Sequence, residues 1–191
     1  MPDPASLVVD LTSHDELRAE AAVAALSDQG ERALEATLPL LESPSSESRW
    51  WALRVVAAIR TPRAAAALTA ALDDLDPLVR HAAAIGLRMQ PSTEAASALV
   101  SRLGDRDRLM ARLASDALAA LGAPALPDLH RALHSSDAGT RIYAARALAS
   151  MHDPAAIPDL FTALDDTSPI VEHWAQRGLE GLGVGMVFFA P

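Results

Sequence analysis

Two rows of large apolar residues recur along this chain at a spacing of about 31 residues, and this period limits its possible folds more than any other feature. In both rows the successive steps are 31, 31, 30 and 31 residues, so the rows share the same one-residue deletion. The first row is Val56, Leu87, Leu118, Leu148 and Leu179, and the second is Leu41, Leu72, Leu103, Leu133 and Leu164. A common register of this length predicts stacked units of one design, none of which buries its apolar face alone.

Each period contains two helical patterns. In the first pattern apolar residues recur every three or four positions, as in Val79, Ala83 and Leu87. This pattern predicts helices over residues 50–59, 78–89, 109–121, 140–151 and 170–182. In the second pattern, leucines four residues apart form a stripe that would face the first helix. These leucine pairs are Leu68/Leu72, Leu99/Leu103, Leu129/Leu133 and Leu160/Leu164. Because the connections are short, successive helices should be antiparallel neighbours.

The residues at the expected helix ends agree with this pattern. A side chain that can cap a helix precedes a proline at Thr61-Pro62, Asp76-Pro77, Asp153-Pro154 and Ser168-Pro169. Ser13 and Glu16 have the spacing of a capping box and should open the first helix. Pro39 falls late in the second helix of the first unit, which should therefore be bent or short.

Some of these segments resemble a known repeat. The residues Asp74, Asp76-Pro77, Val79-Arg80, Ala82-Ala83 and Gly86-Leu87 match the pattern of HEAT-like repeats of the phycobilisome-lyase type, and Ala156-Ile157-Pro158-x-Leu160 resembles the start of that family's second helix. The resemblance covers roughly residues 12–182. It implies an all-α, right-handed α-solenoid of about five and a half helical hairpins.

We therefore expect one HEAT-like repeat domain over residues 1–191. Its repeats should span approximately 13–43, 44–74, 75–105, 106–135 and 136–166, followed by a half repeat at 167–182. The segment 183–191 is an apolar C-terminal tail in the place where another second helix would be expected.

The resemblance also implies a polar ladder between adjacent repeats. Its arginines would be Arg49, Arg80 and Arg141, and its acids Asp74 and Asp105, with each acid paired to the arginine six residues later. Only Asp74 and Arg80 supply both members of such a pair. Serine replaces the acid at 43 and 135, alanine replaces the arginine at 111, and glutamate stands at 172, so the expected ladder is interrupted.

The charge and the residue types that are missing exclude several kinds of function. The formal net charge is −9, which argues against nucleic acid as a partner because duplex binding requires a basic surface. All 16 basic residues are arginine and there is no cysteine, so lysine and thiolate chemistry are excluded. No apolar run is long enough to span a membrane, and residues 1–10 do not resemble a secretory signal. We expect a cytoplasmic protein without a membrane contact.

The second helices of such a solenoid line its concave face, where we expect a partner to bind. In the C-terminal half this groove should contain Asp128, His130, Arg131, Asp159 and Phe161. His130 and His134 are four residues apart, a spacing that suits a metal, but no HExxH motif accompanies them. We therefore assign no metal and no cofactor, and leave a polar binding patch and an ordinary solvated surface as alternatives.

Two further segments are candidate contacts. Trp50 lies beside Trp51 and should point outward, as the tryptophans of interface hot spots do. The tail residues Val187, Phe188 and Phe189 are apolar and prone to form a strand. They could cap the open end of the solenoid or dock on another chain.

We identify no catalytic residues, and an enzyme is the less favoured class. The first hypothesis is a non-catalytic scaffold that binds another protein through the concave groove. The alternative, implied by the resemblance, is a subunit similar to the E/F-type bilin lyases, which handle tetrapyrrole chromophores. A relative of the HEAT-like alkylpurine DNA glycosylases is less favoured because the net charge has the wrong sign for DNA.

Overall fold

The computed structural model describes residues 2–184, and these residues form helices and connecting turns without any strand. They divide into two compact units with a boundary between Ser92 and Thr93. We describe each unit by itself. The all-α class predicted from the two apolar rows is confirmed, whereas the exact limits of the repeats stay predictions.

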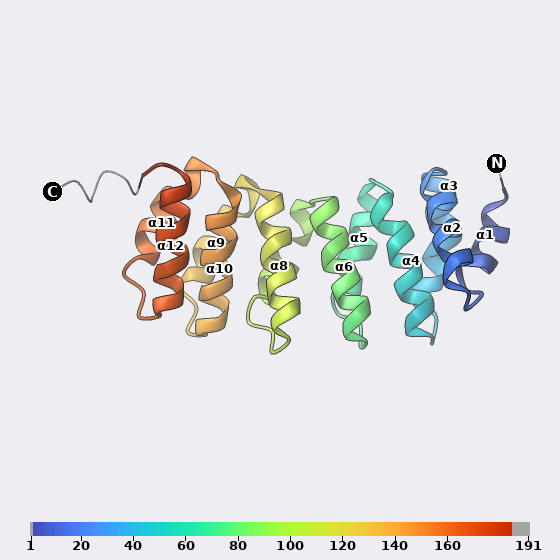
Figure 1. The fold of residues 1–191 in the computed structure, drawn as a ribbon, viewed down its shortest axis with the longest axis horizontal. Coiled ribbons are helices and arrows are strands. Elements are labelled where there is room, and N and C mark those ends of the chain that lie inside the picture. Colours follow the sequence, from blue (N-terminus) through green and yellow to red (C-terminus); the bar gives the residue numbers. More distant parts are fainter. Residues whose placement is uncertain (1, 185–191) are drawn as a thin grey trace. The chain divides into compact units, whose positions relative to one another are not determined.

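The N-terminal unit contains six α-helices and one short 3-10 helix among its described residues (Figure 1). They are α1 (Pro4–Leu11), α2 (Glu16–Ser27), α3 (Glu31–Thr37), η1 (Leu38–Glu42), α4 (Ser46–Ala58), α5 (Pro62–Ala71) and α6 (Pro77–Met89). The first helices α2, α4 and α6 pack side by side, and α3 and α5 pack against them as the second helices. This is the pattern of antiparallel hairpins that the short connections predicted.

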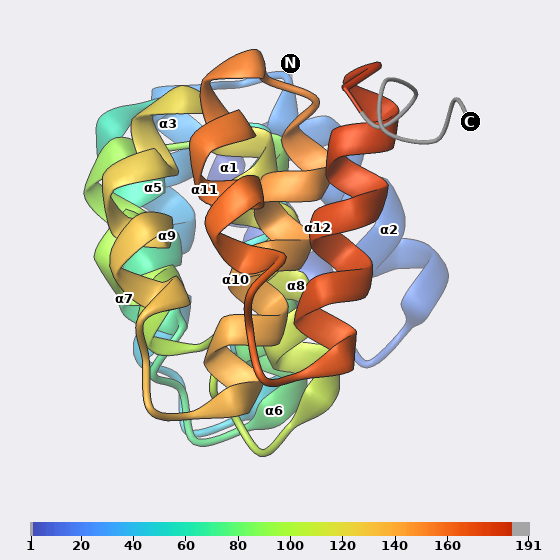
Figure 2. The same cartoon turned by 90° about the vertical axis from the view of Figure 1, so that its left-hand side faces the viewer.

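The C-terminal unit repeats the same hairpin. Its helices are η2 (Thr93–Ala95), α7 (Ala96–Ser101), α8 (Arg108–Leu121), η3 (Ala123–Ala125), α9 (Leu126–Leu133), α10 (Ala138–Met151), η4 (Pro154–Ala156), α11 (Ile157–Ala163) and α12 (Pro169–Gly181). Helices α8, α10 and α12 form one layer, and α7, α9 and α11 form the other. Figure 2 shows these two layers end-on.

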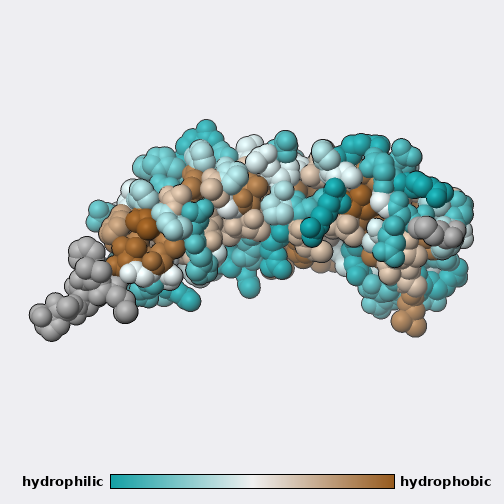
Figure 3. All heavy atoms as spheres, turned by 90° about the horizontal axis from the view of Figure 1, so that it is seen from above, coloured by the Kyte–Doolittle hydropathy of each residue, from teal (hydrophilic) through white to brown (hydrophobic). Residues whose placement is uncertain are grey.

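The two apolar rows supply much of the core. All five members of the first row are buried, with exposed fractions of 5% or less. In the second row Leu72, Leu103 and Leu133 are buried, whereas Leu41 and Leu164, at its two ends, are only partly buried. In Figure 3 apolar atoms gather where the C-terminal unit ends, beyond α12. End residues stay partly exposed because each hairpin needs a neighbour on both sides.

Small residues set how closely the helices approach. A Cβ atom added to Gly178 in α12 would lie 2.9 Å from the Ala149 Cα of α10 and 2.9 Å from both terminal methyl carbons of Leu160. Gly86 in α6 is similarly tight, with a Leu68 methyl carbon 2.7 Å from the added atom. These glycines therefore allow first helices to contact their neighbours closely.

Three of the four predicted proline-associated caps are confirmed. Asp76 Oδ1 accepts a hydrogen bond from the Leu78 amide at 2.8 Å, and Thr61 and Asp153 accept comparable bonds from Ala64 and Ala155. Ser168 occupies the N-cap of α12 but makes no side-chain cap hydrogen bond. Its own amide is instead bound by the Asp166 carboxylate at 2.7 Å.

The start of the chain differs from the prediction. The N-cap of α2 is Asp15, which accepts from the amides of Leu17 and Arg18, so the prediction of a capping box opened by Ser13 was wrong. The Ser13 hydroxyl donates instead to the Asp10 carbonyl oxygen, at the end of α1. The sequence analysis missed α1, whose Leu7 and Leu11 are buried against α2 and α3.

The prediction for Pro39 is confirmed. Helix α3 is only seven residues long, and the chain continues from Leu38 as a 3-10 helix that contains Pro39. The tighter 3-10 turn follows because proline cannot donate the backbone hydrogen bond that the α-helix would require at that position.

Candidate functional site

The groove residues predicted in the C-terminal half lie on two adjacent second helices. Asp128, His130 and Arg131 are on α9, and Asp159 and Phe161 are on α11. The His130 Nδ1 atom lies 2.6 Å from Asp159 Oδ1 and so links the two helices. We call these five residues the second-helix face.

The charges of the second-helix face are paired, with the acids sheltered beneath the basic groups. The Asp159 side chain is 14% exposed, whereas its partner His130 is 56% exposed. Arg131 contacts Asp128 on the same helix, again with the acid sheltered and the arginine exposed. Phe161 is 40% exposed beside them. This arrangement offers a partner an aromatic ring and exposed cationic groups.

The neighbouring histidine is turned toward its own helix. His134 Nδ1 lies 2.9 Å from the His130 carbonyl oxygen, and the two imidazole ring centroids are 5.0 Å apart. Within residues 2–184 there is no group of three or more His, Asp or Glu side chains arranged to hold a metal ion.

Trp50 lies on α4 and is partly covered. Its ring centroid is 4.8 Å from that of Trp51, and the Arg54 guanidinium carbon lies 5.1 Å from the Trp50 centroid. Trp51 is buried, with 6% of its surface exposed, so the more outward tryptophan is Trp50. The predicted contacts Val187, Phe188 and Phe189 lie outside the described residues.

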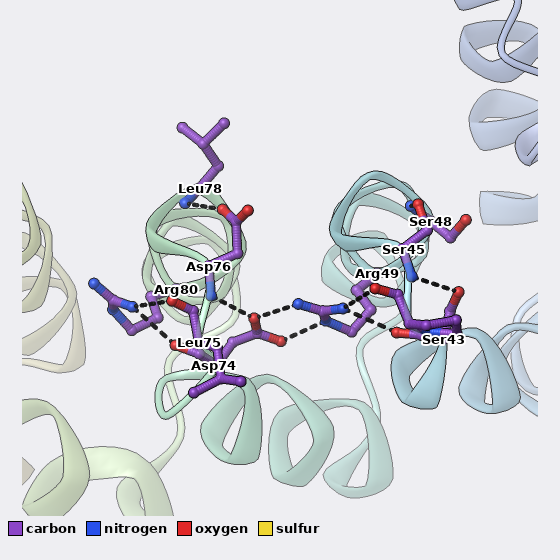
Figure 4. Close-up of polar contacts among 10 residues, drawn as sticks. Ser43, Ser45, Ser48, Arg49, Asp74, Leu75, Asp76, Leu78 and Arg80 are labelled. Atoms are coloured by element: carbon purple, nitrogen blue, oxygen red, sulfur yellow. Dashed lines mark hydrogen bonds and ion pairs between the residues drawn. The ribbon is translucent and has the colours of Figure 1, made fainter.

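The polar ladder has a different geometry from the one that the resemblance implied. Arg49 does not look for an acid at its own loop: its Nε and Nη2 atoms each donate to the Asp74 carboxylate of the next loop at 2.7 Å. Its Nη1 donates to the Ser43 carbonyl oxygen at 2.9 Å. Figure 4 shows this guanidinium between the two loops.

The expected pairing of Asp74 with Arg80 was therefore wrong. Arg80 donates to the backbone carbonyl oxygens of Asp74 and Leu75, while the carboxylate is held by Arg49 (Figure 4). The same carboxylate also accepts the Asp76 amide at 2.8 Å. The Arg49 guanidinium, by its hydrogen bonds, lowers the pKa of the Asp74 carboxyl. The Asp105 carboxylate caps its own turn by accepting the Asp107 amide.

The C-terminal unit contains a second pair of this kind, and its acid was missed. Arg141 Nε donates to Asp166 Oδ2 at 2.7 Å and Arg141 Nη1 donates to the Ser135 carbonyl oxygen. Hydrogen bonding from Arg141 lowers the pKa of Asp166. The sequence analysis assigned Asp166 only to turn capping. Its position, two periods and 92 residues after Asp74 minus one residue of register per deletion, was the signal that identifies it as the equivalent acid.

Each unit has one cavity that is lined by its own residues. In the N-terminal unit a cavity of about 410 Å³ lies between η1 and α5, and small alanines and leucines form much of its wall. In the C-terminal unit a cavity of about 900 Å³ opens on the first-helix layer, near the starts of α8, α10 and α12. We call the latter the outer cavity.

The outer cavity combines arginines with aromatic and aliphatic side chains. Its lining includes Arg106, Arg108, Arg112, Arg146, Ile142, Tyr143, Ile170 and Trp174. The Tyr143 hydroxyl donates to the Arg108 carbonyl oxygen at 3.2 Å. The guanidinium carbons of Arg146 and Arg177 lie 5.6 and 5.7 Å from the Trp174 ring centroid. Sequence reasoning placed Tyr143 and Trp174 at one repeat position but did not foresee the arginines beside them.

The family models match most of the chain. The model of HEAT repeats matches residues 5–88 and 96–180. The chain belongs to the HEAT-repeat family. Each of the two matched stretches lies within one of the structural units, so both units are built from HEAT repeats.

One curated relative of this HEAT-repeat protein is named a bilin biosynthesis protein, RpcF, from Synechococcus sp. (strain WH8020). It is 37% identical over 92 residues, which are 48% of this chain and 44% of that protein. The chain thus matches less than half of the relative's length. The resemblance to the phycobilisome-lyase type of HEAT repeat is confirmed at the level of the family.

Solved structures confirm the repeat fold. The complex of CpcE and CpcF of phycocyanin lyase from Nostoc sp. PCC7120 matches with a TM-score of 0.61 at 24% identity, covering 75% of this chain and 96% of that one. An engineered protein matches with a TM-score of 0.55 at 26% identity, covering 97% and 98% of the two chains. These similarities establish a helical repeat architecture.

No single helix among residues 2–184 is both long and apolar enough to cross a membrane. The segments Arg108–Leu121 and Ala123–Leu133 meet the length and composition criterion only when they are counted together, and they are bent by 120° at the break between them.

Proposed function

We propose that this chain is a bilin-binding HEAT-repeat subunit of the phycobilin-lyase type. The observation that carries the proposal is the 37% identity, over 92 residues, to a protein named for bilin biosynthesis. A generic scaffold function would need no such relative, because designed helical repeats share the same fold. The alternative put forward from the sequence is therefore better supported than the first hypothesis.

The proposed activity is the binding of a linear tetrapyrrole, not a bond-making step by this chain alone. A bilin has an extended conjugated ring system and two propionate groups, so its binding requires an apolar wall and cationic or hydrogen-bonding groups at its edge. The chain supplies arginines and aromatic side chains, and it contains no cysteine that could itself hold a bilin through a thioether. Transfer to an acceptor would require another protein.

The experiment is a titration of biliverdin with the full chain, followed by visible absorption. Binding should shift or sharpen the long-wavelength band, because a folded site restricts the conformations of the free chromophore. The shift should saturate and should disappear when the chain is unfolded by urea. An unchanged spectrum at a large excess of protein would contradict the proposal.

A protein contact at the second-helix face is a second candidate function. It is favoured by the exposed Phe161 beside Arg131 and His130, since aromatic and arginine side chains are enriched in interface hot spots. The triple variant His130→Ala, Arg131→Ala, Phe161→Ala should abolish capture of a protein partner in a pull-down while the melting temperature stays unchanged. Undiminished capture by the triple variant would remove this face from the account.

A further inference from the structure

The outer cavity has an unusual charge for this chain. The whole sequence has a formal charge of −9, yet four of the side chains that line the cavity are arginines and only two are acids. Both acids already have partners. Asp105 accepts the Asp107 amide at 2.8 Å, and Asp137 accepts the amide and the hydroxyl of Thr140, each at 2.7 Å.

Two of the four arginines are not neutralised. Arg106 and Arg108 are exposed, and neither has an ion-pair partner among residues 2–184. By contrast, Arg146 Nη1 donates to Asp116 Oδ1 at 2.7 Å and to the Ser115 hydroxyl at 3.2 Å. Arg112 is 63% exposed and lies 4.0 Å from Asp116, which it shares with Arg146. The cavity therefore has a surplus of positive charge at the start of α8.

The position of that charge is unfavourable for the helix itself. Arg108 is the first residue of α8, and Arg106 precedes the N-cap Asp107. Cations near the N-terminus of a helix are repelled by the aligned peptide dipoles, which favour an anion there. A bound anion would be attracted by the arginines and by the helix terminus together.

The opposite wall of the cavity is apolar. Ile142 and Tyr143 of α10 and Ile170 and Trp174 of α12 line it. These side chains are fixed by their neighbours: the Tyr143 hydroxyl is bound to the Arg108 carbonyl oxygen, and Trp174 lies within 6 Å of two guanidinium groups. The cavity volume of about 900 Å³ is within the range of about 300–1,000 Å³ for small-molecule sites.

We propose that the outer cavity binds a flat, conjugated carboxylate, with its carboxylates at Arg106 and Arg108 and its ring system against Tyr143 and Trp174. Given the proposed function, on which this assignment rests, the ligand is a bilin and the groups at the arginines are its propionates. The site lies on the first-helix layer, so it is separate from the second-helix face and leaves that face open to a protein.

The test compares biliverdin with its dimethyl ester, which has the same ring system but no carboxylate charge. The variant Arg106→Ser, Arg108→Ser should weaken biliverdin binding by about tenfold, because two charge-assisted contacts are lost. The same variant should bind the ester as the unmodified chain does. The matched control is Arg60→Ser, Arg88→Ser, which removes two exposed arginines of the N-terminal unit that likewise have no ion-pair partner in the described part of the chain.

The outcomes separate the two proposals. A loss confined to biliverdin and to the Arg106/Arg108 variant supports the site. If that variant binds biliverdin as tightly as the unmodified chain, or no more weakly than the control variant, the assignment is overturned while bilin binding stands. If the unmodified chain binds neither compound, the proposed function fails and the site assignment fails with it.

Discussion

At the scale of single residues, the structure assigns the ladder arginines a role in joining successive loops. Arg49 and Arg141 each donate both to a backbone carbonyl oxygen of their own loop and to a carboxylate 25 residues later. The arginine positions were evident from the sequence. The partner was not, because a separation of six residues and one of 25 both fit a repeating pattern, and only the folded stack brings the second pair together.

The Arg141–Asp166 pair predicts a pH-dependent stability. The side chains are only 15% and 11% exposed, so Asp166→Asn should lower the free energy of unfolding by about 1–3 kcal/mol at neutral pH. Because hydrogen bonds from Arg141 lower the pKa of Asp166 in the folded state, its contribution is complete above the unfolded pKa of about 4. It is lost as the pH falls through the lowered folded pKa.

Urea unfolding at a series of pH values measures this. The difference between the unmodified chain and Asp166→Asn should be constant near neutral pH and should shrink below about pH 4. Asp165→Asn is the matched control, since Asp165 is its exposed neighbour. Equal effects of the two substitutions would show that the ion pair does not stabilise the unit.

At the scale of helices and turns, the sequence was informative wherever the 31-residue period applied. The leucine rows, the proline-associated caps and the break at Pro39 were predicted from spacing and from backbone chemistry. Helix α1 was missed because Pro4–Leu11 lies outside the period. It forms because Leu7 and Leu11, four residues apart, are buried against the first hairpin, which is a tertiary effect.

The close contact of α12 with α10 gives a prediction at this scale. Gly178→Ala should destabilise the chain by about 1–3 kcal/mol, because the new methyl group would lie 2.9 Å from backbone and side-chain atoms that are buried. Gly181→Ala is the control in the same helix, since its nearest neighbour would lie at 3.6 Å, an ordinary contact distance. Thermal unfolding of both variants would decide, and a Gly178→Ala chain as stable as the control would show that the helices separate easily.

At the scale of the whole molecule, the family and the helical class followed from the repeat, but the outer cavity did not. Arg106 lies in a turn and Arg108 at a helix start, outside both apolar rows. Tyr143 and Trp174 come from two later repeats. Only the stacking of α8, α10 and α12 places these four side chains around one space. Repeat reasoning identifies what the units share, whereas a binding site is built from what differs between them.

The measurement that tests the central claim most directly is visible circular dichroism of biliverdin during the titration with the full chain. Free bilins interconvert between mirror-image helical shapes and give no net signal, whereas a defined protein site selects one of them. The account predicts an induced signal that saturates at about one bilin per chain and vanishes when the chain is unfolded. An absent signal, or one that grows without saturation as more bilin is added, would contradict the claim that this HEAT-repeat protein binds a bilin.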